Sequence, residues 1–245
     1  MLLIILRRLG QSVFVLFLVA FVSFMMFRYV GNPVDNVLGQ EATVEQREAL
    51  IEALGLNDPL HVQYLDFVTR AVQFDFGNSY RGALPVADMI LERLPATLEL
   101  AMVSALFAMF FGVIAGVYTA IFRNRFLANV IMSSSLIGVS LPTFLIGVLL
   151  IWLFAVELGW LPSFGRGETV QIGFWTTSLL TVSGLKSLVL PAITLGLYQM
   201  TLIMRLVRAE MLEVLRQDFI RFARARGLPE HVVYFGHALK NTLVP

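Results

Sequence analysis

Few residues in this sequence have the types and spacing that catalysis, metal binding or nucleotide hydrolysis would need. His61, His231 and His237 form no metal-ligand pattern, and the absence of cysteine excludes disulfides and cysteine–metal sites. The segment Gly184–Ser187 reads Gly-Leu-Lys-Ser, which lacks the glycine that precedes the lysine of a phosphate-binding loop. We therefore expect a non-catalytic protein without catalytic, cofactor-binding or metal-binding residues.

The polar residues of interest lie within or beside long apolar segments, where a polar or ionisable side chain is a functional candidate by default. Five of them are candidates for lining a pathway through a membrane: Glu99, Ser140, Thr143, Tyr198 and Gln199. The alternative is structural. Serine and threonine often serve helix packing, and Glu99 would then stand at the water interface or help to start a helix.

The composition explains why a membrane is expected around these residues. Of the 245 residues, 58% are hydrophobic and 14% are charged, whereas a soluble domain has about 45–50% apolar and about 25% charged residues. One globular core cannot bury such an excess, so a bilayer is the simplest environment for it. The net charge of +1 gives no indication of a nucleic-acid partner.

Four apolar blocks are long enough to cross a bilayer, for which a helix needs about 20 residues. They cover residues 9–27, 100–122, 126–156 and 187–204. Pro142 lies inside the third block and Pro191 near the start of the fourth. For the first block the alternative is a cleaved signal peptide with Arg7 and Arg8 as its charged start, but the block is long and no Ala-x-Ala site follows.

The charges between the blocks predict an orientation, because cytoplasmic loops collect lysine and arginine. The chain start, the link between the second and third blocks and the segment after the fourth are rich in arginine. The segment 31–96 instead carries ten acidic residues against four arginines. We therefore predict that both ends of the chain are cytoplasmic, and that 31–96 and 157–186 lie on the outer side.

The segment 31–96 is expected to fold as a small helical insertion. Thr43 with Gln46 three residues later forms a capping-box pattern in front of a helix over 44–54, and Gly55 supplies the stop. A second helix is expected after Pro59, where apolar residues recur at helical spacing. Those residues are Leu60, Tyr64, Phe67, Val68 and Ala71.

Chain-breaking residues precede a third short helix, which is expected over 86–94. The breakers before it are Gly77, Gly82 and Pro85, and Pro95 is expected to mark the start of the second span. The second outer loop carries aromatic residues that suit a membrane interface. They are Trp160, Phe164, Phe174 and Trp175.

The stretch 213–245 is too charged to cross the bilayer. Its start predicts a helix whose apolar residues recur every three or four positions with arginines opposite them: Met211, Leu215, Phe219 and Phe222. Gly227 and Pro229 predict a tight turn before a second short helix over 230–241. The pattern leaves two interpretations open, a helical projection that a partner's groove grips and a basic helix lying on anionic lipid.

This stretch resembles the cytoplasmic coupling motif, or EAA loop, of the permease subunits of ABC importers, in the form found in the dipeptide/oligopeptide/nickel permease family. The matching residues are Phe222-Ala223-Arg224-Ala225-Arg226-Gly227-Leu228, His237-Ala238-Leu239-Lys240-Asn241 and Pro245. Segments 6–9, 54–60, 76–79 and 93–101 resemble further motifs of that family. The resemblance therefore extends over essentially the whole chain.

The resemblance implies an all-α membrane protein that forms the translocation pathway of an ATP-driven importer. Its solutes would be peptides or related small molecules brought by a periplasmic or extracellular solute-binding protein. The other implied partners are a second homologous permease subunit, two cytoplasmic ATP-binding subunits and the lipid bilayer of a bacterial or archaeal cytoplasmic membrane. The resemblance assigns ATPase coupling to Phe219, Phe222, Ala223, Arg224, Ala225, Arg226, Gly227 and Leu228.

The resemblance also suggests a division of the chain. Residues 1–30 would hold the first span, 31–96 a periplasmic helical insertion, and 97–245 the permease domain ending in the coupling motif 213–245. Spans within that domain would cover about 98–122, 128–156 and 187–207. Family members usually have six spans, and we expect the two C-terminal spans of that pattern to be absent from these 245 residues. The alternatives are a secondary transporter, a membrane-embedded enzyme or a scaffold, none of which would copurify with two ATPases and a second permease.

Overall fold

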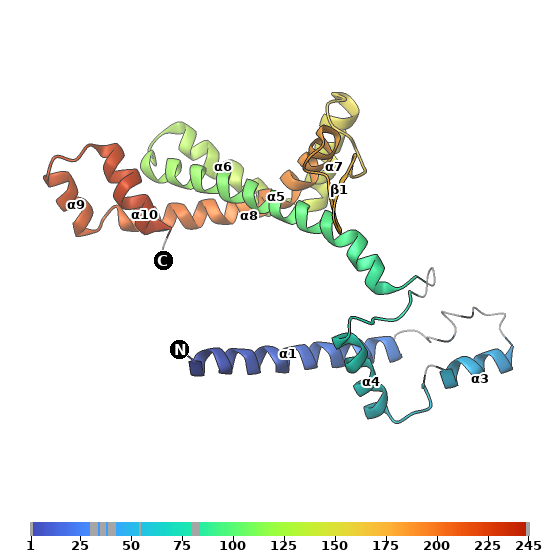
Figure 1. The fold of residues 1–245 in the computed structure, drawn as a ribbon. Coiled ribbons are helices and arrows are strands. Elements are labelled where there is room, and N and C mark those ends of the chain that lie inside the picture. Colours follow the sequence, from blue (N-terminus) through green and yellow to red (C-terminus); the bar gives the residue numbers. More distant parts are fainter. Residues whose placement is uncertain are drawn as a thin grey trace. The chain divides into compact units, whose positions relative to one another are not determined.

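The computed structural model describes residues 2–29, 34, 38, 43–53, 55–79 and 84–243, which divide into two compact units, 1–93 and 94–245 (Figure 1). In this part of the chain three helices are long and apolar enough to cross a membrane: Leu3–Met26, Val86–Ile121 and Val182–Val214. A pair of helical segments with a sharp bend between them, Phe126–Ser140 and Thr143–Glu157, raises the number of candidate spans to four if the pair is counted as one span. All four predicted blocks fall on these helices.

The first unit contains helices α1 (Leu2–Tyr29), α3 (Val44–Ala53) and α4 (Leu60–Val72). The predicted capping box is present at the start of α3, where the Thr43 N–H donates to Gln46 Oε1 (3.1 Å) and the Gln46 N–H donates to Thr43 Oγ1 (3.3 Å). Gly55 has a φ of 62° and so provides the left-handed stop that the sequence predicts. Leu54, the predicted last residue of α3, lies outside the described residues.

Helix α4 packs on α1 through the aromatic residues of its predicted apolar side. The Tyr64 ring lies 5.6 Å from the Phe21 ring and 5.7 Å from the Phe24 ring, centroid to centroid. The Tyr64 hydroxyl donates to the Phe17 carbonyl oxygen at 2.8 Å. The helical spacing in 60–71 therefore identified the packing side of α4 correctly.

The third predicted helix and the second span form one helix, α5 (Val86–Ile121), so Pro95 lies inside a helix and does not start a separate span. Proline removes one helical hydrogen bond, but Pro95 is buried and the residues on both sides are helical. A proline is tolerated in membrane-spanning helices because neighbouring helices, polar side chains and local adjustments satisfy the freed backbone groups. Gly77 has a φ of 70°, as expected of a chain breaker, whereas Gly82 lies outside the described residues.

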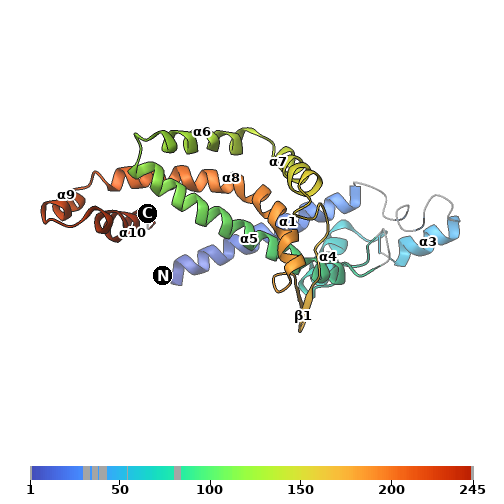
Figure 2. The ribbon, with the colours of Figure 1, turned by 90° about the horizontal axis from the view of Figure 1, so that it is seen from above.

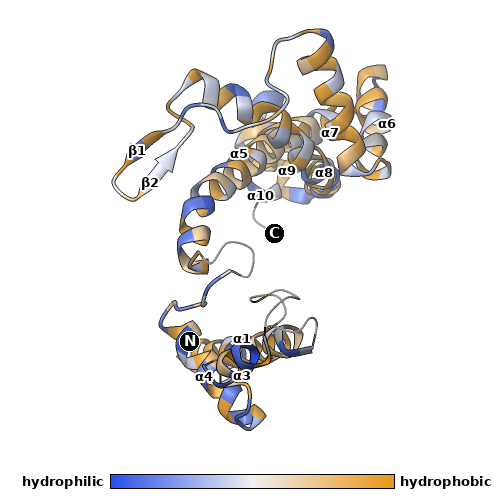
Figure 3. Cartoon of the chain, turned by 90° about the vertical axis from the view of Figure 1, so that its right-hand side faces the viewer, coloured by the Kyte–Doolittle hydropathy of each residue, from blue (hydrophilic) through white to orange (hydrophobic). Residues whose placement is uncertain are grey.

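The third predicted span is broken into α6 (Phe126–Ser140), α7 (Thr143–Ile151) and the π-helix η1 (Trp152–Glu157). The two halves are bent by 107° at the break. Pro142 stands immediately before α7 with an extended backbone (φ −58°, ψ 137°). The predicted proline kink is therefore a sharp corner. Hydrophobic residues dominate α7 in Figure 3.

A β-hairpin follows η1 and was absent from the all-α prediction. Strand β1 (Val170–Ile172) pairs antiparallel with β2 (Trp175–Thr177), with Ile172 opposite Trp175. Gly173, with a φ of 63°, permits the two-residue turn between the strands. Three-residue strands give too short an alternation to be recognised in the sequence.

Helix α8 (Val182–Val214) packs closely along α5 (Figure 2). A Cβ added at Gly112 would lie 3.0 Å from the Met200 carbonyl oxygen, one at Gly116 would lie 2.8 Å from that of Met204, and one at Gly196 would lie 2.6 Å from Phe107 Cδ1. The glycines of both helices thus let the two backbones approach each other.

The chain ends in α9 (Asp218–Ala225), the π-helix η2 (Val232–Ala238) and α10 (Leu239–Thr242). These elements share one buried core with α5 and α8. Its members are Val117, Ala120, Val207, Met211, Ile220, Ala223, Val233 and Ala238. The terminal helices are therefore fixed to two of the apolar helices.

The predicted apolar stripe from Met211 to Phe222 is wrong in one respect. Met211 is buried, but Phe219 and Phe222 are 42% and 64% exposed, and Ile220 and Ala223 face the core instead. The physical reason is that α8 ends at Val214 and a turn precedes α9, so the helical phase is not carried across.

Candidate functional site

The exposed side of α9 combines aromatic and basic side chains. We call it the α9 face and define it by Phe219, Arg221, Phe222, Ala225 and Arg226, all of which are exposed. The Arg226 guanidinium carbon lies 5.7 Å from the centroid of the Phe222 ring. Aromatic rings and arginines are the residues most enriched at the centre of protein interfaces. The α9 face therefore has the composition of a docking surface.

The opposite side of α9 attaches it to the rest of the second unit. Ala223 is only 6% exposed and lies in the core with Ile220, while Leu228 packs against that core as a partly buried residue. Both residues were predicted to take part in ATPase coupling, and in the structure they pack α9 against the core that it shares with α5 and α8.

The turn after α9 depends on Gly227. Its φ of 78° lies in the left-handed region, which favours glycine. The Gly227 N–H donates to the Arg224 carbonyl oxygen (2.9 Å) and the Leu228 N–H donates to that of Ala223 (3.3 Å), which closes the end of the helix. A Cβ at Gly227 would meet nothing within 4 Å, so the requirement is conformational and not one of space.

Arg224 joins α9 to the helix that follows the turn. Its Nε donates to Glu230 Oε1 (3.0 Å), its Nη2 donates to Glu230 Oε2 (3.2 Å), and its guanidinium lies 6.0 Å from the Tyr234 ring centroid. Hydrogen bonding from Arg224 holds the pKa of the Glu230 carboxyl below its ordinary value, and the same contact raises the pKa of Arg224. The pair therefore links the end of α9 to the start of the helix after the turn.

Acidification should loosen this connection. The pKa of Glu230 is lower in the folded chain than its ordinary value of 4.5. The stability that the ion pair contributes is therefore fully present above pH 4.5, and it is lost as the pH falls through the lower pKa of the folded chain. The effect should be small because the pair is exposed. A spin label at Ala225 should become more mobile on acidification, and Glu230→Gln should be mobile at neutral pH and insensitive to acid. Equal mobility of both proteins at every pH would contradict this.

An open groove of about 700 Å³ borders the α9 face, between the end of α8 and the start of α9. It is lined by Ala209, Leu212, Glu213, Arg216, Gln217, Asp218 and Arg221. Arg221 belongs to both the groove and the α9 face, where its Nη1 lies 3.3 Å from Asp218 Oδ1. A partner that covers the α9 face would therefore also meet a hollow with charges of both signs.

Four of the five predicted pathway residues lie where α6 and α7 pass α8. Ser140 and Thr143 stand on either side of Pro142, and Tyr198 and Gln199 are neighbours on α8; all four are exposed. The α6–α7 corner runs beside this part of α8, because a Cβ at Gly138 would lie 2.8 Å from Thr201 Oγ1 and one at Gly147 would lie 3.3 Å from Thr194 Cγ2.

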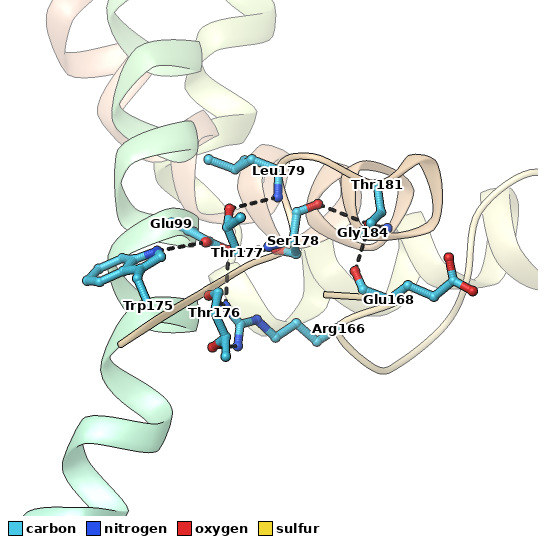
Figure 4. Close-up of polar contacts among 10 residues, drawn as sticks. All are labelled: Glu99, Arg166, Glu168, Trp175, Thr176, Thr177, Ser178, Leu179, Thr181 and Gly184. Carbon is cyan, nitrogen blue, oxygen red and sulfur yellow. Dashed lines mark hydrogen bonds and ion pairs between the residues drawn. The ribbon is translucent and has the colours of Figure 1, made fainter. Parts of the chain in front are cut away.

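The fifth predicted pathway residue, Glu99, is buried in a separate polar cluster (Figure 4). Its Oε1 accepts from Trp175 Nε1 (3.2 Å). Its Oε2 accepts from Ser178 N (3.1 Å), Ser178 Oγ (2.6 Å) and Arg166 Nη2 (3.2 Å). Sequence reasoning missed this cluster and assigned Trp175 to the membrane interface. The one available signal was an acidic residue on an apolar helix together with a single arginine in the loop 157–186.

Both parts of the chain match models of one protein family. Residues 108–245 match the family model of the inner membrane component of binding-protein-dependent transport systems, and residues 1–101 match the model of its N-terminal part. A dipeptide transport system permease protein of Alkalihalophilus pseudofirmus is 38% identical over 98% of this chain and 76% of its own length. A di/tripeptide transport system permease protein of Pseudomonas aeruginosa is 39% identical over 98% and 75%. A glutathione transport system permease protein of Escherichia coli is 35% identical over 98% and 74%. The chain therefore belongs to the family of inner membrane components of binding-protein-dependent transport systems.

Proposed function

We propose that this chain is the permease subunit of an ATP-driven ABC importer and forms the translocation pathway for peptides or related small solutes. The similar proteins are named as permeases for dipeptides, di/tripeptides and glutathione, which supports a peptide-like solute. In this proposal an extracytoplasmic binding protein delivers the solute and a second homologous permease completes the membrane domain. Both ends of the chain face the cytoplasm, as the arginine-rich segments favour.

The observation that carries this proposal is the α9 face standing on a core shared with two apolar helices. We assign Phe219, Phe222, Ala225 and Arg226 to direct contact with a groove of one of two cytoplasmic ATP-binding subunits. Exposed aromatic residues beside arginines suit such a groove. Ala223 and Leu228 hold α9 on its core, and Arg224 and Gly227 fix its direction. All eight residues then serve coupling, but only part of them by contact.

The shared core supplies a mechanical route from the ATPases to the membrane. When the two ATP-binding subunits close on ATP, the groove that holds α9 displaces it. Ile220 and Ala223 pack with Val117 of α5 and Met211 of α8 in one core, so α9 cannot shift alone. Densely packed elements move as rigid bodies, and α5 and α8 would change their tilt together.

The pathway would be lined by exposed polar residues at the level where the α6–α7 corner passes α8. We assign this role to Ser140, Thr143, Tyr198 and Gln199, beside the corner between α6 and α7. A broken helix leaves backbone polar groups without helical partners, and at membrane depth such backbone is tolerated where it lines a cavity. We assign the buried Glu99 a different role, described below.

Replacing Phe222 by alanine should weaken the ATPase contact without unfolding the chain. Phe222 is 64% exposed, so the stability should change by no more than about 0.5 kcal/mol. If the ring is an aromatic anchor worth about 2 kcal/mol, affinity for the ATP-binding subunits should fall about 30-fold. The measurements are copurification of the ATPases with the tagged chain and ATP-dependent peptide uptake into proteoliposomes.

Phe126→Ala is the matched control, because Phe126 is 83% exposed at the start of α6, on the side predicted to be cytoplasmic. It should behave like the unmodified chain in both assays. Normal copurification and uptake by Phe222→Ala would rule out the coupling role. Loss of binding to anionic lipid vesicles with ATPase binding intact would instead support a lipid-binding role for the α9 face.

A further inference from the structure

The Glu99 cluster joins α5 to one continuous segment of the chain. The donors to Glu99 are Arg166, Trp175 and Ser178, which all belong to residues 158–181 between η1 and α8. We call this stretch the hairpin segment. Each carboxylate oxygen of Glu99 accepts at least one bond from it, and the Glu99 side chain is 1% exposed. The carboxylate is thus placed to hold the segment and is not directed towards a solute.

The hairpin segment is also closed on itself and on the start of α8. Arg166 Nη1 donates to Thr176 Oγ1 (3.1 Å), which connects the chain before β1 to β2. The Thr181 hydroxyl donates to the Glu168 carbonyl oxygen (2.6 Å), and the Glu168 N–H donates to Ser183 Oγ (3.1 Å). The segment therefore behaves as one piece, and Glu99 fixes that piece to α5.

The α5–α8 pair extends from this cluster to the core under α9. Glycines allow close approach of the two backbones at three levels, Gly196 near Phe107, Gly112 near Met200 and Gly116 near Met204. Beyond the last of these levels, the same two helices contribute to the core that contains Ala223. One tightly packed pair thus carries the hairpin segment at one end and α9 at the other.

We propose that Glu99 is a positioning residue that locks the hairpin segment onto the α5–α8 pair, so that the segment moves with α9. The inference rests on the proposed function, because ATP-driven displacement of α9 is the movement that reaches the hairpin segment. A carboxylate suits this position because it only accepts hydrogen bonds, and the cluster presents only donors to it. A glutamine keeps only one accepting oxygen, so its NH2 group would face either Trp175 Nε1 or the donors of Arg166 and Ser178. It would also leave the Arg166 charge without its partner.

The first test measures whether Glu99 holds the hairpin segment against α5. It uses the full chain in nanodiscs without nucleotide. The chain has no cysteine, so spin labels can be placed at Phe174, which is 93% exposed at the hairpin turn, and at Met102, which is 53% exposed on α5. The distance distribution should be narrow in the parent and broad in Glu99→Gln. Glu92→Gln, an exposed position on the same helix, should leave it narrow. A narrow distribution in Glu99→Gln would overturn the proposal.

The second test measures how attachment of the hairpin segment affects the coupling of uptake to ATP hydrolysis in the assembled transporter. In Glu99→Gln, the ratio of solute uptake to ATP hydrolysed should fall about tenfold, within the range of coupling between distant sites, while copurification of the ATPases stays normal. Glu99→Asp keeps a carboxylate that only accepts hydrogen bonds and should retain part of the ratio, which a general folding defect would not give. An unchanged ratio in Glu99→Gln, or equal loss in Glu99→Asp and Glu99→Gln, would contradict the positioning role.

The two tests separate failure of this inference from failure of the proposed function. The distance measurement needs no ATPase and no solute, so it can fail while uptake and ATPase copurification by the parent chain remain normal. If instead the parent chain neither binds ATPases nor imports solute, the proposed function fails while the distance result still stands.

Discussion

Gly116→Leu should separate α5 from α8 and abolish uptake. A Cβ at this position would lie 2.8 Å from both the Met204 carbonyl oxygen and Val207 Cβ, and the first of these is backbone that cannot turn away. Overpacking costs about 1–3 kcal/mol, and occasionally more, and we expect the upper end because the helix backbones are in contact. Unfolding in a denaturing detergent series, together with uptake into proteoliposomes, measures both effects.

Gly10→Leu is the matched control for that experiment. Gly10 also lies in a helix long enough to cross the membrane, α1, but a Cβ there would meet nothing within 4 Å. Its stability should stay within about 0.5 kcal/mol of the parent. Equal stability and uptake in the two leucine variants would show that close approach of α5 and α8 is not required.

Ala223→Leu should release α9 from its core. Ala223 is 6% exposed and shares the core with Met211 and Val233, so three added carbons have no space. The cost of overpacking is about 1–3 kcal/mol, enough to shift a single eight-residue helix into a partly detached state. Amide hydrogen exchange over 218–225 should accelerate, and ATP-dependent uptake should fall with it.

Ala225→Leu separates this effect from loss of the partner contact. Ala225 lies on the same helix but is exposed on the α9 face. Its hydrogen exchange should stay slow, and any loss of uptake would then report the interface and not the fold. If Ala223→Leu leaves exchange over 218–225 unchanged, the shared core does not hold α9.

Local signals in the sequence predicted local structure well. The Thr43–Gln46 capping box and the left-handed Gly55 were correct because both depend on residues within a few positions of each other. The predicted positions of the apolar blocks were correct because the length of an apolar segment can be read directly from the local composition. The expected separation at Pro95 was wrong because a membrane-spanning helix can tolerate a proline that would end an isolated helix in water.

Contacts between distant residues were the part that the sequence could not supply. Glu99 meets Arg166 and Ser178 across 67 and 79 positions, so no spacing rule connects them. The prediction of which side of α9 is buried was wrong because the turn after Val214 shifts the helical phase. Resemblance identified the residues of the candidate site, but only their packing separates Phe222, which is exposed, from Ala223, which is buried.

The shared core under α9 also determines when the α9 face can exist during synthesis. Val117 and Ala120 are made early, Val207 and Met211 much later, and Ile220 and Ala223 later still. Chains fold from the N-terminus as they emerge, so α9 has nothing to pack against until both long helices are inserted and paired. A half-inserted chain therefore displays no docking surface. Under the proposed function, recruitment of the cytoplasmic ATP-binding subunits would then be a checkpoint that only a correctly inserted chain passes.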